Sequence, residues 1–243
     1  MSATRLASLI VERQPCVVLT GAGISTESGI PDFRSPTGIW ADIDPVEVAS
    51  IDAFRRDPGR VWEFYGRRLG MLGDIEPNAG HRALVELEQR GLVTAVVTQN
   101  VDGLHQRAGS REVVEVHGSL ANAVCPGCGA GSSIDDIRKQ LDEGPVPLCV
   151  ECSTPLKPGV VMFGELLPAA AIERATALAR AAGLVLVVGS SLEVWPVAGL
   201  PLEAAAFAIV NLGPTTLDGQ ALLRIEGGAG ETLEAVVEAL PED

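Results

Sequence analysis

Amide, carboxylate and imidazole side chains gather within residues 98–118, and such groups can bind a polar ligand and move a proton. A β-branched apolar run at residues 93–97 stops abruptly before Gln99, Asn100 and Asp102. The run is typical of a buried strand, so the polar residues are expected at its carboxyl end. In open α/β sheets, ligands bind at that end of the strands.

A second apolar run, residues 113–116, ends in the same way at His117 and Gly118. Two neighbouring strands would then deliver an amide, a carboxylate and an imidazole to one crevice. A neutral histidine, whose ordinary pKa is near ~6.5, is suited to act as a general base at physiological pH. His105 falls at the expected start of a helix and His81 lies apart from other polar residues, so we expect structural roles for both.

Four of the five cysteines form two C-x2-C pairs with twenty residues between them: Cys125, Cys128, Cys149 and Cys152. This spacing falls in the range for a four-thiolate zinc site, in which each pair forms a turn that points two sulfurs at one tetrahedral ion. A redox pair or two disulfides are the alternatives, but neither explains two pairs at this separation in a short Gly/Pro-rich insert. Since protein would fill all four positions, we expect one structural zinc.

Apolar runs that alternate with amphipathic segments position these groups. Strands are predicted at residues 16–20, 93–97, 113–116, 184–188 and 207–210. Helical spacing appears at residues 6–10, 81–90, 168–179 and 233–240. This alternation predicts an α/β fold, a Rossmann-like parallel sheet covered by helices on both faces. A small zinc-binding module and a helical insert would lie beside it.

A glycine-rich turn, Gly21-Ala22-Gly23-Ile24-Ser25, follows the first predicted strand. It lacks the usual dinucleotide fingerprint, since G-x-G-x-x-G would need glycine at Thr26. Gly21 and Gly23 would let backbone N–H groups approach a pyrophosphate, with a helix N-terminus behind them, but a plain tight turn fits the spacing equally well. The segment that follows, residues 31–40, is rich in breakers and predicts a mobile loop.

Residues 44–72 are predicted to form the helical insert, in which Asp57-Pro58 marks a helix start. Tyr65 and Arg68, three positions apart, would be neighbours on one helical face. From spacing alone, a part-buried tyrosine beside a solvated arginine is the favoured interpretation.

Several motifs together resemble the sirtuins, a family of NAD-dependent protein lysine deacylases. The core is TQN-x-D-x-LH-x-x-AG followed by HG, at residues 98–118. GAGIS and GIPDFRS precede it, and KPGVVMFGELLP at residues 157–168 and VGSSL at residues 188–192 follow it in the family's order. The motifs span nearly the whole chain, so a chance match to all of them is not credible.

The resemblance implies that the amide oxygen of an acyl-lysine attacks the nicotinamide ribose of NAD and displaces nicotinamide. His117 would then act as general base on a ribose hydroxyl, and the products would be free lysine and O-acyl-ADP-ribose. Asn100 and Asp102 would orient the ribose, the nicotinamide amide and a water, and Phe33 would shield the reactive carbon. The implied NAD contacts are Gly21, Ala22, Gly23, Ser25, Asp32, Phe33, Arg34, Gln99, Asn100, Asp102, Gly189, Ser190, Ser191 and Asn211.

The resemblance also bears on the acyl group. Y-x-x-R at Tyr65 and Arg68 is similar to members that accept acidic acyl groups, and Ala49 matches the small residue that widens their pocket. This implies removal of succinyl and malonyl groups as well as acetyl groups. The substrate backbone would add as a strand between residues 163–165 and 192–194. The implied substrate contacts are Tyr65, Arg68, Ala49, Phe163, Glu165, Leu192 and Val194.

The composition of this chain of 243 residues limits the classes of partner and the cellular location that can be expected. Its net charge of −14, from 32 acidic and 18 basic residues, argues against nucleic acid because an acidic surface repels phosphates. No segment approaches the ~18 consecutive apolar residues of a membrane span. Residues 6–11 are too short for a signal peptide, and the cysteine usage suits a reducing compartment. A cytoplasmic protein is therefore expected, with a monomer favoured.

The expected Rossmann-like domain comprises residues 1–34, 75–120 and 158–243, and the expected small domain comprises residues 35–74 and 121–157. Two other functions remain open. A protein ADP-ribosyltransferase would use the same NAD site without an acyl pocket, and nicotinamide release that depends on acyl-peptide separates the two. A non-enzymatic NAD-responsive or zinc-ribbon binding module would need no base such as His117.

Overall fold

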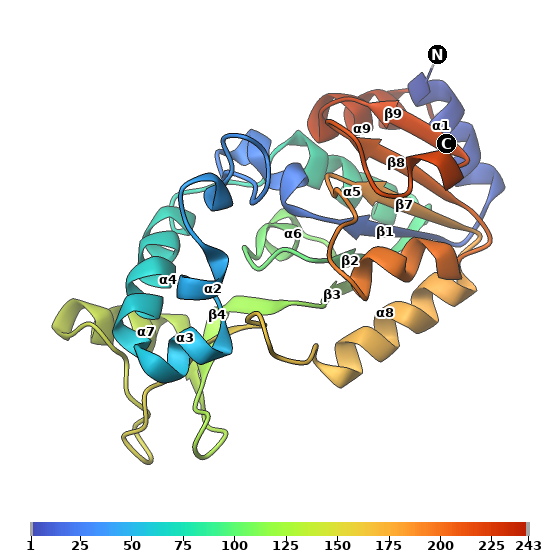
Figure 1. The fold of residues 1–243 in the computed structure, drawn as a ribbon. Helices are drawn as coiled ribbons and strands as arrows, with labels where there is room; N and C mark the ends of the chain where they lie inside the picture. Colours follow the sequence, from blue (N-terminus) through green and yellow to red (C-terminus); the bar gives the residue numbers. More distant parts are fainter. Residues whose placement is uncertain (1, 242–243) are drawn as a thin grey trace.

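Six strands form one sheet in a computed structural model that describes residues 2–241 (Figure 1). Their order is β3-β2-β1-β7-β8-β9, and every neighbouring pair is parallel. The strands are β1 Cys16–Thr20, β2 Val93–Thr98, β3 Val113–Glu115, β7 Leu184–Val188, β8 Phe207–Asn211 and β9 Leu223–Glu226. The predicted α/β fold with a parallel sheet is confirmed.

Helices cover both faces of this sheet, because its strands carry apolar side chains on both sides. In β1, Cys16 and Val18 belong to one apolar cluster, whereas Val17 and Leu19 belong to another. The first cluster is covered by α1 Ser2–Glu12, α5 Ala79–Gln89 and α9 Ala229–Glu238. The second is covered by α8 Ala169–Ala181 and the 3₁₀ helix η3 Val197–Glu203. The short helix α6 Leu104–Ala108 follows β2 at the edge of the site.

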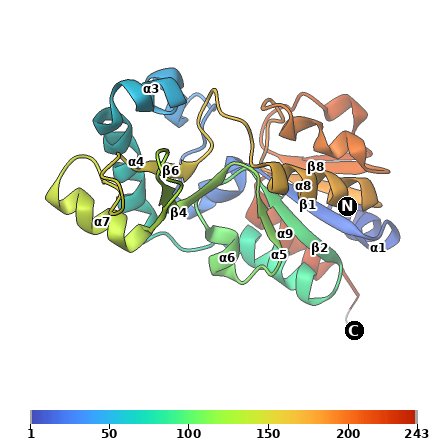
Figure 2. The same cartoon turned by 90° about the horizontal axis from the view of Figure 1, so that it is seen from below.

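A smaller part, set apart from the parallel sheet in Figure 2, contains a three-stranded antiparallel sheet of order β5-β4-β6. Its strands are β4 Gly118–Val124, β5 Gly131–Ser133 and β6 Lys157–Val160. Its helices are α2 Pro45–Val48, α3 Ile51–Arg56, α4 Pro58–Leu72 and α7 Ile134–Glu143. They share one apolar core around Trp62, whose indole Nε1 donates to the carbonyl oxygen of Leu156 at 2.7 Å.

The helical insert predicted for residues 44–72 is three helices, because two capping residues interrupt it. The Ser50 side chain accepts from the backbone N–H of Ala53 and begins α3. Asp57 accepts from the N–H of Arg60 at 3.1 Å and begins α4, with Pro58 at the first helical position. The capped starts fix the direction of α4, which carries Tyr65 toward the main sheet.

Two further elements complete the fold. The glycine-rich turn leads into the 3₁₀ helix η1 Ala22–Ser28. Strand β9, at the edge of the parallel sheet, was not predicted. In the small sheet, β4 pairs with β6, which ends at Val160.

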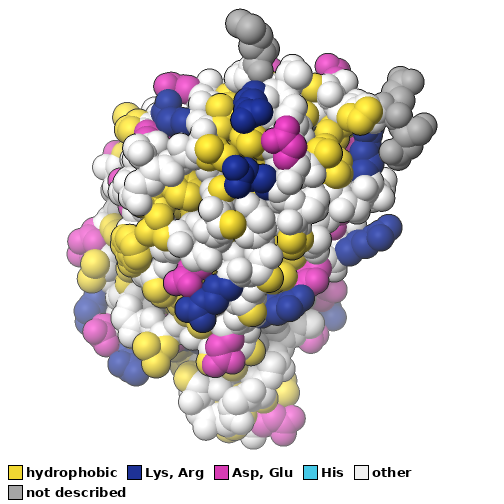
Figure 3. All heavy atoms as spheres, turned by 90° about the vertical axis from the view of Figure 1, so that its right-hand side faces the viewer, with side chains coloured by type: hydrophobic (Ala, Val, Ile, Leu, Met, Phe, Trp, Pro, Cys, Tyr) yellow, Lys and Arg dark blue, Asp and Glu magenta, His cyan; other side chains and the backbone are white. Residues whose placement is uncertain are grey.

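The surface of the large domain carries charges of both signs. On the face shown in Figure 3, acidic and basic side chains are interspersed among apolar ones. Within residues 2–241, no helix has the length and apolar character needed to cross a membrane.

Candidate active site

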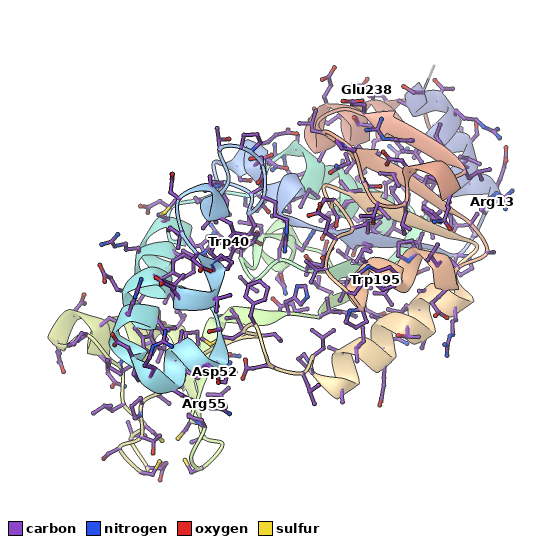
Figure 4. All side chains as sticks on the ribbon, in the orientation of Figure 1. Arg13, Trp40, Asp52, Arg55, Trp195 and Glu238 are labelled. Atoms are coloured by element: carbon purple, nitrogen blue, oxygen red, sulfur yellow. The ribbon has the colours of Figure 1, made fainter. Side chains whose placement is uncertain are left out.

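A cleft of about 960 Å³ runs along the carboxyl ends of the strands, between the parallel sheet and the small part. Strand β1 lies at the point where the strand order reverses, and ligands of doubly wound folds bind at such a point. Figure 4 shows Trp40 and Trp195 on opposite sides of this cleft, and both line it. Its volume lies at the upper end of the range for ligand pockets, about 300–1,000 Å³.

Most of the residues singled out in the sequence line this cleft. From the large domain these are Gly21, Ala22, Gly23, Asp32, Phe33, Arg34, Gln99, Asn100, His117, Gly189, Ser190, Ser191, Val194 and Asn211. From the small part and its connections these are Ala49, Tyr65, Arg68, Phe163 and Glu165. Ser25, Asp102 and Leu192 are not among the lining residues.

Two glycine turns meet at the floor of the cleft. Gly21 N donates to Val188 O at 3.1 Å, and Gly23 N donates to Gly189 O at 2.9 Å. A Cβ on Gly23 would lie 2.8 Å from the Cα of Gly189, closer than carbon atoms can approach. Only glycine therefore lets the two strand ends pack backbone to backbone. The two turns form a tight backbone floor. The N–H groups of Gly21 and Gly23 are already bonded within it, so a pyrophosphate would be bound by other N–H groups of these turns.

His117 follows β3 and is held in one tautomer. Its Nδ1 lies 3.1 Å from the carbonyl oxygen of Gln99, and since a carbonyl only accepts, Nδ1 carries the proton. The lone pair of Nε2 is therefore free. Burial lowers the pKa of His117 below its ordinary value, the bond to Gln99 raises it, and the charge of Arg34 lowers it further. The ring is a neutral base at physiological pH.

Asn100 is held by Gly21, at the floor of the cleft, and by Ser25, which stands behind the cleft wall. Its Nδ2 donates to Gly21 O at 3.1 Å and to Ser25 Oγ at 3.2 Å. Ser25 Oγ donates in turn to Asp102 Oδ2 at 2.8 Å, and Asp102 Oδ1 accepts from Leu104 N at 3.0 Å. In this structure the carboxylate of Asp102 orients the Asn100 amide through Ser25.

The loop after η1 is closed on itself. Asp32 Oδ1 accepts from the N–H groups of Arg34 and Ser35 at 2.9 and 2.8 Å. The backbone of Phe33 and Trp40 is joined by a hydrogen bond of 3.0 Å from Trp40 N to Phe33 O. Asp32 thereby fixes the conformation of the loop as well as lining the cleft. The hydrogen bond between Trp40 and Phe33 places these two residues side by side.

An aromatic stack joins this loop to helix α4. The ring of Trp40 lies 5.2 Å from Phe33 and 5.7 Å from Phe64, centroid to centroid, and both pairs are stacked. Phe64 meets Tyr65 edge to face at 5.0 Å. Trp40 and Phe64 line the cleft but were not predicted, because an aromatic residue beside an apolar core looks the same in sequence as a core residue.

Arg68 lies over this stack, with its guanidinium carbon 5.1 Å from the centroid of Phe33. Burial lowers the pKa of Arg68 and raises that of the neighbouring Tyr65, so the tyrosine is a neutral hydroxyl donor. Among the described residues, no carboxylate lies within ion-pair distance of Arg68. The interpretation of a solvated arginine is therefore wrong. A mostly buried cation faces the cleft, and the charge of Asp102, which raises the pKa of Arg68, acts on it from beyond ion-pair distance.

The backbone near residues 163–165 is partly engaged within the protein. Phe163 N donates to Ala49 O at 2.9 Å, and Phe163 O accepts from Ile51 N at 3.0 Å. Glu165 Oε2 accepts from Lys157 Nζ at 3.0 Å and from Met162 N at 2.8 Å. On the other side, Leu192 has a φ of +57° and its side chain is buried in the core. Glu193 and Val194 line the cleft there.

The four paired cysteines converge at the tip of the small part. Their sulfur atoms all lie within 4.8 Å of one another, with Cys125 Sγ 3.4 Å from Cys152 Sγ and Cys128 Sγ 3.6 Å from Cys149 Sγ. Four thiolates at Zn–S distances of ~2.3 Å around a tetrahedral ion would be about 3.8 Å apart. The donor set and its spacing fit one structural zinc with no open coordination position.

Comparisons with known proteins agree on one family. The model of the Sir2 family matches residues 21–196. The NAD-dependent protein deacylase 2 of Pyrobaculum aerophilum is 46% identical over 237 residues, which cover 96% of this chain and 94% of that protein. A solved Sir2 variant with a deacetylated p53 peptide and 3'-O-acetyl ADP ribose superposes with a TM-score of 0.94, at 39% identity, covering 99% of this chain and 100% of that one. A Sir2 complex with a p53 peptide and NAD+ gives 0.90 at 39% identity, covering 98% of each chain.

Proposed function

This chain belongs to the Sir2 family, and from that premise we propose that it is an NAD-dependent protein lysine deacylase. The observation that carries the proposal is His117, a neutral base with a free Nε2 on the wall of a cleft whose floor is bare glycine backbone. A protein that only bound NAD would need no such base. The similar structures that hold a peptide with NAD+ or with an acetylated ADP-ribose support the same substrates for this cleft.

In this proposal the floor of the cleft binds the NAD pyrophosphate, and the strand ends bind its two riboses. Gly21, Gly23 and Gly189 shape this floor, because a Cβ on any of them would collide with the opposite turn and force the two turns apart. Ser190, Ser191 and Asn211 face the adenosine side. Gln99, whose Nε2 donates to Ser190 Oγ at 2.9 Å, joins this group to the catalytic side of the cleft.

His117 acts as the general base for a hydroxyl of the nicotinamide ribose. The hydrogen bond from Nδ1 to Gln99 O holds the ring in place, so that Nε2 can accept a proton without a change of tautomer. Asn100, fixed by Gly21 and Ser25, orients the ribose and the nicotinamide amide. The ribose hydroxyl captures the acyl carbon and water then releases the lysine, so the products are nicotinamide, O-acyl-ADP-ribose and free lysine.

The acyl-peptide enters as an added strand. Phe163 N and O, Glu165 N and Val194 O are already bonded within the protein, so the peptide would pair with the remaining N–H and C=O groups of residues 164–165 and 193–194. Main-chain pairing reads the sequence around the lysine weakly, so many acylated proteins would be substrates.

A peptide panel tests the activity. Acetyl-, malonyl- and succinyl-lysine peptides, incubated with NAD, are expected to yield nicotinamide and O-acyl-ADP-ribose in equal amounts by mass spectrometry. Nicotinamide release should depend on the acyl-peptide. Transfer of labelled ADP-ribose from NAD to a protein, without loss of an acyl group, would instead identify a protein ADP-ribosyltransferase.

The acyl pocket favours a carboxylate at the tip of the acyl chain, so that succinyl- and malonyl-lysine are substrates. Arg68 is a mostly buried cation without an anionic partner among the described residues, and a buried charge is costly until it is paired. Its planar fork can bond both oxygens of a carboxylate, and the neutral Tyr65 hydroxyl can donate a further bond. Ala49, small and 4% exposed, leaves room for the longer chain.

Arg68→Met is expected to raise the KM for a succinyl-peptide by roughly 10- to 100-fold and to change deacetylation little, since charge-assisted hydrogen bonds contribute about 1.5–3 kcal/mol each. The loss should fall on KM, because the acyl tip lies away from the reacting carbonyl and is bound alike in the ground and transition states. Arg67→Met is the matched control on the same helix, where Arg67 is exposed and pairs with Glu63 at 2.6 Å. Equal slowing of both acyl substrates by Arg68→Met would show that Arg68 serves the fold and not acyl choice.

A further inference from the structure

A chain of buried hydrogen bonds connects His105 to the backbone of Asn100. His105 Nε2 lies 2.9 Å from Thr20 Oγ1, Thr20 Oγ1 lies 2.8 Å from Thr98 Oγ1, and Thr98 Oγ1 accepts from Asn100 N at 3.0 Å. All four residues are buried, with at most 6% of any of them exposed. Thr20 and Thr98 are also register partners at the ends of β1 and β2.

The direction of these bonds follows from their donors. The Asn100 N–H can only donate, so Thr98 Oγ1 accepts from it, and Thr20 Oγ1 donates its proton to the same oxygen. Thr20 Oγ1 must then accept from His105, whose Nε2 carries the ring proton. Burial lowers the pKa of His105 to about 3, so the ring is neutral and has one proton to donate. His105 thus fixes the rotamer of the Thr20 hydroxyl, which in turn fixes that of Thr98.

Packing alone does not account for two threonines at these positions. Val18, Val96 and Val97 fill the neighbouring positions of the same strands, and valine has the shape of threonine without the hydroxyl. A hydroxyl without a hydrogen bond is costly in such a core. Gln99 N also donates to Thr20 O at 3.0 Å, so Thr20 and Thr98 together hold both residues that lead from β2 into the cleft.

The geometry points to His105 as a positioning residue: through Thr20 and Thr98 it fixes the backbone at Asn100, so that the Asn100 amide meets the nicotinamide ribose of NAD in one orientation. This inference rests on the proposed function. His105 itself does not line the cleft, and its effect on the reaction passes through the two hydroxyls. A displacement of about 1 Å of a positioning group can cost on the order of 10²-fold in rate.

Thr98→Val tests the connection, because it keeps the shape of the side chain and removes the acceptor of the Asn100 N–H. It is expected to lower kcat for NAD-dependent deacetylation about 10- to 100-fold, while the KM for the acetyl-peptide stays within roughly twofold. Thr98→Ser, which restores the hydroxyl, should recover kcat to within about threefold of the native protein. His105→Leu should resemble Thr98→Val, whereas His105→Gln, which can present an N–H at the same distance, should recover part of the rate.

Thr94→Val is the control for loss of a hydroxyl on the same strand. Thr94 is exposed at the end remote from the cleft, where its Oγ1 donates to Cys16 O at 3.1 Å. If Thr98→Val keeps a kcat within threefold of native, as Thr94→Val should, the inference is wrong. Should Thr98→Val fail to fold, Thr20→Val and Thr20→Ser make the same comparison. A native protein that releases no nicotinamide with acyl-peptides would refute the proposed function itself, before any variant is made.

Discussion

His117→Ala is expected to lower the kcat of NAD-dependent deacetylation by at least the ~10²–10⁴-fold that accompanies loss of a general base. The imidazole stands at the cleft wall with its Nε2 lone pair free, because Nδ1 donates to Gln99 O. Alanine leaves no group there that can take a proton from the ribose. The floor that binds the pyrophosphate is backbone of other segments, so NAD binding should remain.

Formation of O-acyl-ADP-ribose and free lysine, together with calorimetric titration of NAD, measures this effect, because nicotinamide is displaced before His117 acts. Circular dichroism of the variant should match that of the native protein, since His117 lies at the surface of the cleft and not in either core cluster of the sheet. If His117→Ala turned over at a rate close to that of the native protein, His117 would not be the general base.

Cys149→Ala is expected to release zinc and to unfold the small part of the protein. Structural zinc in small domains can contribute on the order of 10 kcal/mol or more to folding. The cysteine sulfurs join the turn after β4 to the turn before β6, and Cys125 and Cys149 also belong to the apolar core around Trp62. We therefore expect an aggregating protein, and not a soluble inactive one.

Cys16→Ala is the control for this prediction. Cys16 is buried in β1 and belongs to the core of the parallel sheet, not to the small part that carries the thiolate cluster, so its loss removes a thiol without removing a ligand. Elemental analysis should find one zinc per chain in the native protein and in Cys16→Ala, and less in Cys149→Ala. A fully active native protein that contains no zinc would rule out the metal site.

The central sheet could be predicted because parallel strands buried on both faces are continuous apolar runs in the sequence. Leu184–Val188 and Phe207–Asn211 are such runs, and each ends in glycine, serine or asparagine where the cleft begins. Strand Leu223–Glu226 escaped prediction because it is an edge strand. Apolar Leu223 and Ile225 alternate there with charged Arg224 and Glu226, a pattern of only four residues.

Most of the residues singled out in the sequence line the cleft, but the sequence could not show which few lie behind its wall, because that depends on contacts between distant segments. Ser25 and Asp102 stand in motifs beside Asn100 or Gly23, yet they bond to each other across 77 positions of sequence and lie behind the wall. Leu192 turns into the core because its backbone adopts a left-handed conformation that no pattern of residue types predicts. Conversely, His105 has no polar neighbour in sequence that indicates its bond to Thr20.

The position of β1 at the middle of the sheet also affects how the protein is made. On the ribosome, β1 is synthesised first and can pair early with β2, but its other neighbour, β7, begins only at Leu184. At synthesis rates of about 5–20 residues per second, the interval between the synthesis of β1 and that of β7 lasts roughly 10–30 s. Throughout that time one side of β1 has unpaired N–H and C=O groups, which can pair with other chains. The nascent chain is therefore most exposed to aggregation before β7 emerges, and a chaperone that protects it must bind within this interval.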